Sequence, residues 1–309
     1  MALPLDRVIH VNVNCSDLRR SLAFYQDFVG VKSESHTDPE PQDGTGFGMP
    51  GAVQWDANIL HDERGYEGPG IDLLEWKIPT PTGLPYAEPN HLGFYRLCLL
   101  VPDIDAVYSQ AQERGVPCLS APQEVLLDRD AGISVRALFC HDPDGSLVEF
   151  VEHESARVPR LAHVNVNCSD LSLSTEWYER VMGLEVRGAS KPGPVSGEAF
   201  GLAGEVEWDA RFLFIPGRED MAIDLLEWKR PTPIGRPYEE ANHLGIYRMA
   251  FGVGDIQACH DELRAQGVEC PPPVFLDMGP EIPVDGVWAS FFFDPDGTCL
   301  ELIETPTLG

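Results

Sequence analysis

The stretch HVNVNCSDL occurs twice in the chain, as His10–Leu18 and again as His163–Leu171. Polar residues alternate with valines at its start, which predicts a β-strand whose two faces meet different surroundings. We expect the valine face to pack on helices. The polar face lines either a ligand-filled cup or solvent, and the alternation alone allows both.

The repeat extends over the whole chain. The motifs IDLLEWK, NHLG and DPDG each occur once in the first half and once in the second. Corresponding residues are separated by 153 positions at the first motif (163 − 10) and by 152 at a later one (243 − 91). We therefore predict two homologous halves, 1–156 and 157–309, joined by the short polar segment HESARVPR.

Each half is predicted to contain two βαβββ modules. Helices are expected over 16–30, 103–115, 170–183 and 255–267, with Ser16 or Asp17 capping the first and Gly30 ending it. In the first half, strands are expected after the initial one near Val31–His36, Val53–His61, Ile71–Lys77, Val116–Ser120, Ser134–His141 and Ser146–His153.

Three motifs carry a resemblance to a known family. They are D-L-x-x-S-L-x-F-Y at Asp17–Tyr25, V-P-D-I-D at Val101–Asp105, and D-P-D-G-x-x-x-E at Asp142–Glu149 and Asp294–Glu301. The pattern resembles the vicinal oxygen chelate superfamily of glyoxalase I, bleomycin resistance proteins and extradiol dioxygenases. The resemblance implies an α+β fold, in which four modules form two cup-shaped, mostly antiparallel half-barrels with helices outside. The cups form either within each half or by exchange between halves.

Four glutamates interrupt strongly apolar predicted strands, where a carboxylate is costly unless it is paired or coordinated. The resemblance implies metal ligands at His10 and His163 and at these glutamates, which also become candidate general bases: Glu75, Glu149, Glu227 and Glu301. Imidazole with carboxylate suits Zn, Ni, Co, Mn or Fe(II).

The fourth ligand position departs from the family pattern, because Arg96 and Arg248 stand where a histidine is usual. A guanidinium is always protonated and cannot ligate a cation. In one interpretation His10, Glu75 and Glu149 bind a metal while Arg96 holds an anionic substrate. In another no metal binds, Arg96 pairs with one of the glutamates, and the cup simply binds a ligand.

A third interpretation takes the missing imidazole from the NHLG loops, at His91 and His243, which with Fe(II) would suit oxygen chemistry. The tyrosines of the same loops either cover the cup mouth or belong to a rigid crossover between modules. Predicted substrate contacts are Arg96, Arg248, Asn12, Asn14, Asn165, Asn167, Tyr86 and Tyr238.

Composition limits the partners. The formal charge of −28, from 22 Lys and Arg against 50 Asp and Glu, disfavours nucleic acid and anionic membranes. The eight cysteines form no CxxC pair, and the N-terminal residues lack the pattern of a secretory signal. We expect a cytoplasmic monomer or homodimer that takes a small-molecule substrate.

The leading hypothesis is a glyoxalase-like, metal-dependent lyase or isomerase that acts on a small oxygenated metabolite through a metal-stabilised enolate. An extradiol-type ring-cleaving dioxygenase is the first alternative, supported by the four-module length and the two loop histidines. A metal-free protein that binds a small molecule, as resistance proteins do, is the second.

Overall fold

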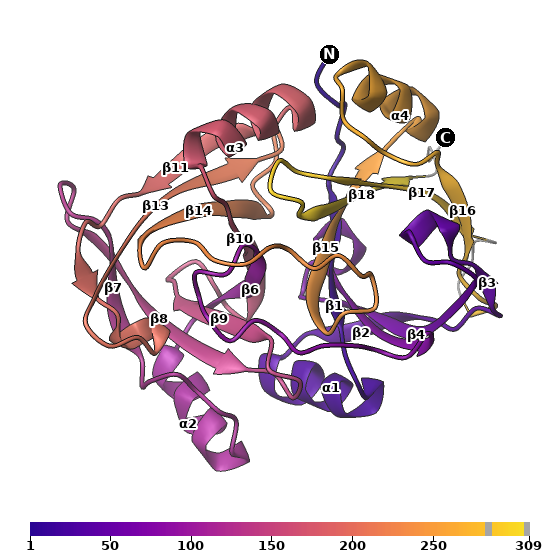
Figure 1. The fold of residues 1–309 in the computed structure, drawn as a ribbon. Helices are drawn as coiled ribbons and strands as arrows, with labels where there is room; N and C mark the ends of the chain where they lie inside the picture. The colour runs from indigo at the N-terminus through magenta and orange to yellow at the C-terminus, as the bar shows by residue number, and fades with distance from the viewer. Residues whose placement is uncertain (282–285, 306–309) are drawn as a thin grey trace.

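The computed structural model describes residues 1–281 and 286–305. They form four modules, each of which begins with a strand and a helix (Figure 1). The first half contains β1 (Val8–Asn14), α1 (Leu18–Phe24), the π-helical turn η1 (Tyr25–Val29), β2 (Lys32–Thr37), β3 (Gln42–Asp43), β4 (Ala52–His61), β5 (Gly70–Ile78), β6 (Gly93–Val101), α2 (Ile104–Arg114), β7 (Gln123–Asp128), β8 (Ile133–His141) and β9 (Leu147–Glu152).

The second half repeats this order. It contains β10 (Arg160–Asn167), α3 (Leu171–Trp177), the π-helical turn η4 (Tyr178–Met182), β11 (Glu185–Ser190), β12 (Val195–Ser196), β13 (Glu205–Phe214), β14 (Ala222–Arg230), β15 (Gly245–Val253), α4 (Ile256–Ala265), β16 (Val274–Asp277), β17 (Gly286–Phe293) and β18 (Cys299–Glu304). The predicted βαβββ modules are confirmed.

Local signals set the helix ends as predicted. The Asp17 side chain accepts a hydrogen bond from the backbone of Arg20, and the helical segment ends at Gly30, which has φ +91°. One predicted strand is wrong. Residues 116–120 contain Pro117 and make only one isolated bridge, and the strand of this module is β7, three residues further on. Within the described part of the chain, no helix is both long and apolar enough to cross a membrane.

The strands of the described residues form two curled sheets, and each sheet combines modules from both halves. One has the order β16-β17-β18-β15-β1-β5-β4-β2, with β3 beside β4. The other has the order β11-β13-β14-β10-β6-β9-β8-β7, with β12 beside β13. Most neighbours are antiparallel, and the parallel pairs are β1–β5, β15–β18, β6–β9 and β10–β14. The α+β class is confirmed, and the cups form by exchange between the halves.

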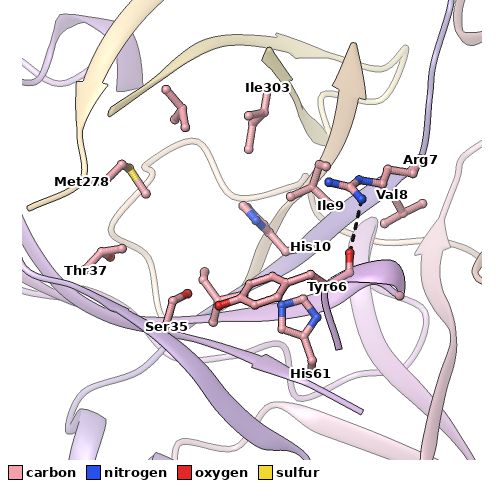
Figure 2. A pocket seen from close by; sticks show the side chains of 13 residues that line it. Arg7, Val8, Ile9, His10, Ser35, Thr37, His61, Tyr66, Met278 and Ile303 are labelled. Atoms are coloured by element: carbon pink, nitrogen blue, oxygen red, sulfur yellow. Dashed lines mark hydrogen bonds between the residues drawn. The ribbon is translucent and has the colours of Figure 1, made fainter. Parts of the chain in front are cut away.

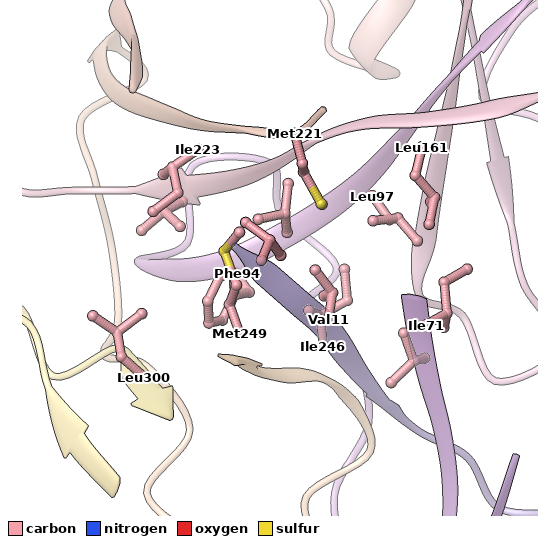
Figure 3. Packing of buried hydrophobic residues seen from close by; sticks show 14 of the residues in the cluster. Val11, Ile71, Phe94, Leu97, Leu161, Met221, Ile223, Ile246, Met249 and Leu300 are labelled. Atoms are coloured by element: carbon pink, nitrogen blue, oxygen red, sulfur yellow. The ribbon is translucent and has the colours of Figure 1, made fainter. Parts of the chain in front are cut away.

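The main hydrophobic core lies on the helix side of both sheets. Val11 and Val164 are fully buried in it, together with residues of strands from both sheets (Figure 3). Two smaller apolar clusters lie on the opposite faces, around Trp55 and Trp76 in one sheet and Trp208 and Trp228 in the other. The valine face of the first strand therefore packs as predicted, and its polar neighbours point into the cups.

Candidate functional site

Four ionisable side chains from four strands meet in the cup built around β1 and β15. Arg248 donates from Nε to Glu301 Oε2 at 2.7 Å and from Nη2 to Asp72 Oδ2 at 2.8 Å. His10 Nε2 lies 3.4 Å from Glu301 Oε2 and 3.8 Å from Asp72 Oδ2. None of the four residues is more than 7% exposed. The strands therefore assemble a buried His–Asp–Arg–Glu group.

The cup built around β6 and β10 contains the same group. Arg96 donates from Nε to Glu149 Oε2 and from Nη2 to Asp224 Oδ2, both at 2.7 Å. His163 Nε2 lies 3.2 Å from Glu149 Oε2. Because Arg96 comes from the first half while Asp224 and His163 come from the second, each group needs both halves.

Each group lines a cavity. Arg96, Glu149, His163 and Asp224 line one of about 210 Å³. The group of the other cup lines a small inner cavity of about 40 Å³, which shares six lining residues, His10 among them, with a neighbouring cavity of about 190 Å³ (Figure 2). Both groups are therefore placed to contact a ligand in a cup.

One nitrogen of each guanidinium is left over. Nη1 of Arg96 and Nη1 of Arg248 are buried and make no hydrogen bond to any residue that the structure describes. Buried polar groups are nearly always satisfied, since an unpaired one costs about 1–3 kcal/mol. The two carboxylates thus hold each guanidinium in place while one charged donor remains for a ligand oxygen.

The guanidinium also sets the charge of its partners. Burial by itself would raise the pKa of Glu149, but Arg96 and His163 outweigh it and lower the pKa to about 2. Burial likewise raises the pKa of Glu301, but Arg248 and His10 outweigh it, so this pKa is also lowered. Both glutamates stay ionised at neutral pH and are weak bases, which argues against their predicted role as general bases.

Lowering the pH should remove the stability that the ionised, paired Glu149 gives to the folded protein. The folded pKa of Glu149, about 2, lies below the ordinary value of 4.5, so the contribution is complete above pH 4.5 and is lost as the pH falls toward 2. This difference in the pKa of Glu149 corresponds to roughly 3 kcal/mol in the free energy of unfolding. We expect the stability gap between wild type and E149Q, measured by thermal unfolding from pH 7 to pH 3, to shrink over this range. The exposed Glu113→Gln is the control, and a gap that does not change with pH would contradict the assignment.

The structure corrects the placement of Glu75 and Glu227. Glu75 accepts a hydrogen bond from the Leu18 backbone at 2.9 Å and pairs with Lys77, both on the outer face of the sheet. Glu227 makes the equivalent contacts in the other half. Since side chains alternate along β5, Asp72 faces the cup and Glu75 faces the helix. Asp72 and Asp224, which the sequence prediction missed, are the carboxylates that β5 and β14 contribute to the charged groups.

The polar face of the first strand is buried, so the solvent-exposed alternative is wrong. Asn12 donates to Asp72 Oδ2 at 3.0 Å, and Asn165 donates to Asp224 Oδ2 at 3.2 Å. These two amides orient the aspartates. The next asparagines bind loop carbonyls instead: Asn14 donates to Ala241 and His243, and Asn167 donates to Pro89 and His91.

The loop histidines and tyrosines form a separate feature. His91, Tyr86, Tyr238 and His243 stack in that order, with ring centroids 3.8, 4.0 and 3.9 Å apart. The stack ties the two crossover loops together and matches the rigid-crossover alternative. His91 and His243 do not line the cavities of the charged groups described above, which corrects their assignment as ligands.

The donor set fits a metal only in part. Ligand atoms of Cys98, Glu149 and His163 lie within 4.8 Å of one another and could hold an ion. Without an ion, burial raises the pKa of Cys98 well above 9.0, so the thiol is a ligand only if the ion displaces its proton. In the other cup Ala250 takes the register position of Cys98. The two cups share the His–Asp–Arg–Glu group. Because its fourth member is a guanidinium, which cannot ligate a cation, the shared group is not a four-ligand metal centre.

Comparisons with known proteins agree with this architecture. A family model described as the Glyoxalase/Bleomycin resistance protein/Dioxygenase superfamily matches residues 7–150 and 160–302. Glyoxylase I 4 of Arabidopsis thaliana is 26% identical over 176 residues, which cover 55% of this chain and 85% of that protein. The name Glyoxylase I 4 describes the Arabidopsis protein and is not transferred to this chain.

Two solved structures share the fold over nearly the whole chain. Glyoxalase I from Zea mays aligns with a TM-score of 0.68 and 18% identity, covering 96% of this chain and 92% of its own. A putative dioxygenase from Bacillus subtilis aligns with a TM-score of 0.64 and 17% identity, covering 99% and 87%. At these identities the structural matches establish the fold.

Proposed function

Because the chain belongs to the glyoxalase/bleomycin resistance protein/dioxygenase superfamily, we propose that its cups bind a small oxygenated metabolite and move a proton next to its carbonyl group, as a lyase or isomerase does. One observation carries the proposal. In both cups a buried guanidinium is fixed by two carboxylates next to a histidine, and its Nη1 has no partner among the residues that the structure describes.

The guanidinium suits the negative charge that such a reaction creates. When a base removes the proton from carbon, the electron pair of the C–H bond moves toward the carbonyl and its oxygen becomes an enolate. A charged donor at Nη1 of Arg96 or Arg248 would stabilise that oxygen more than the neutral carbonyl. The carboxylates that fix the guanidinium keep the donor in place before the charge develops.

Histidine is the better candidate for the base. Glu149 is held ionised by Arg96 and has a pKa of about 2, so it takes up a proton poorly. A carboxylate next to an imidazole orients the ring and stabilises its protonated form, and His163 and Glu149 stand in this relation. The imidazole would take the proton and return it to the neighbouring carbon in an isomerase, whereas in a lyase a leaving group departs.

Deuterium exchange tests the proposal without knowledge of the natural substrate. We expect the protein in D₂O to speed the replacement of the α hydrogens of α-hydroxyacetophenone, dihydroxyacetone or acetoin, measured by proton NMR against buffer alone. Exchange at the buffer rate for all three would contradict it. Binding of a probe without exchange would favour the non-catalytic alternative.

A metal-dependent form is the second candidate, favoured by the Cys98, Glu149 and His163 group in one cup. A metal there would act as a Lewis acid on a substrate oxygen. Exchange that stops after chelation and returns with Zn, Ni, Co, Mn or Fe(II) would support this form. Exchange that persists through chelation would support the guanidinium form.

A further inference from the structure

Besides Cys98 against Ala250, the two cups differ at a position near His10. In the cup around β1, Gly70 pairs across the sheet with His10 on one side and with His61 on the other. Two imidazoles therefore flank a residue without a side chain on the same face. In the other cup the sequence repeat puts Phe214 at the position of His61, in the pair of stretches WDANILH and WDARFLF.

His61 is buried without using its polar atoms. It is 4% exposed, and neither ring nitrogen makes a well-formed hydrogen bond to a described residue. It lines the cavity of about 190 Å³ together with His10, and the ring of Tyr66 lies over it at 5.0 Å between centroids (Figure 2). The backbone contact of His61 with Pro69 is not well formed, and a buried imidazole without satisfied hydrogen bonds is destabilising unless a ligand group meets it.

The fold does not need an imidazole here. Phe214 takes the corresponding position of β13, where it is half-buried, so an apolar ring is compatible with this strand. Burial lowers the pKa of His61, and the ring is therefore uncharged at neutral pH, with one nitrogen able to donate and the other to accept. Such a ring matches a hydroxyl or carbonyl better than an anion.

We propose that His61 binds a second, uncharged oxygen of the ligand in this cup, so that the two cups recognise different molecules. The assignment rests on the proposed function for the first oxygen, which lies on Arg248 Nη1. The wall between the two polar ends is mostly apolar: Ile59, Met278 and Ile303 line both neighbouring cavities, and Thr37 is a polar residue among them. The ligand class is an aryl or alkyl ketone that carries a separate hydroxyl or carbonyl group.

Two probes isolate the second oxygen. Para-hydroxyacetophenone has a ketone and a remote hydroxyl, whereas acetophenone has the ketone alone. Their affinities are measured from the ring NMR signal of His10, which reports on this cup in every protein and is assigned by its loss in His10→Asn. The comparison uses wild type, H61F and H153F. His153 is the matched control, because it lines the other cavity but is exposed and already bonded to Ser155.

We expect wild type and H153F to prefer the hydroxylated probe by roughly three- to tenfold, the range of one neutral hydrogen bond. H61F should bind both probes equally, with the affinity for acetophenone little changed. Equal binding of the two probes by wild type, or the same preference in H61F, would overturn the role of His61 alone. Failure of both probes to bind would overturn the proposed function, and the inference with it.

Discussion

Replacing Arg96 with Met should destabilise the protein by about 3–5 kcal/mol, the range for removing one member of a buried ion pair. The substitution leaves Glu149 and Asp224 ionised and buried, and His163 is the one cationic side chain left beside them among the described residues. The measurement is urea unfolding at neutral pH followed by circular dichroism. R248M should behave alike, because Arg248 has the same two partners in the other cup.

The surface network around Arg136 provides the matched control for this experiment. Arg136 also contacts two carboxylates, Asp105 and Glu152, but its side chain is 41% exposed. Exposed pairs contribute little because water screens them, so R136M should change the unfolding midpoint only slightly. Equal losses in R96M and R136M would show that the buried group does not hold the cup together. Adding E149Q and D224N to R96M should restore part of the lost stability.

Replacing both cup histidines, His10 and His163, with Asn should slow the proposed exchange by about 100- to 10,000-fold, the usual contribution of a positioned acid–base group. Stability should change less than in R96M, because the guanidinium pairs with two buried carboxylates at 2.7–2.8 Å while the imidazole makes the longer contact. The rate of deuterium incorporation and the melting temperature, measured on the same samples, separate the two effects.

The single variants then divide the activity between the cups. H10N removes the imidazole of one cup and H163N that of the other, while His153→Asn alters an exposed histidine outside both groups. If the double variant exchanges protons within twofold of wild type, the histidines are not the bases. A loss confined to one single variant would identify the active cup.

The sequence predicts the modules well because their signals are local: the alternation in β1, the Asp17 cap and the repeated motifs each act over a few residues. It also names His10, Arg96 and Glu149, which the structure places in the two buried charged groups. The error at Glu75 has a physical reason. Alternation along IDLLEWK shows that Asp72 and Glu75 face opposite sides, but which side is the cup depends on how β5 pairs with β1, a contact between distant residues.

The loop histidines were misplaced for a similar reason. Their spacing from the arginines left a bent loop possible, and only the packing of two distant loops reveals that His91 stacks on Tyr86. The pairing of modules across the halves is also invisible in the sequence, since the two halves are nearly equivalent. Repeated motifs identify the duplicated modules, but they do not show which two modules pair to form a cup.

The exchange of modules between the halves makes this chain a tethered counterpart of a symmetric dimer. In a dimer of identical subunits, any substitution enters both sites at once. Here one cup combines the first and last modules of the chain, and the other combines the two middle modules. Each cup is therefore built from residues that the other cup does not contain. The cups differ in this way at His61, which corresponds to Phe214, and at Cys98, which corresponds to Ala250. The covalent link keeps the halves at high effective concentration while one site changes and the other does not.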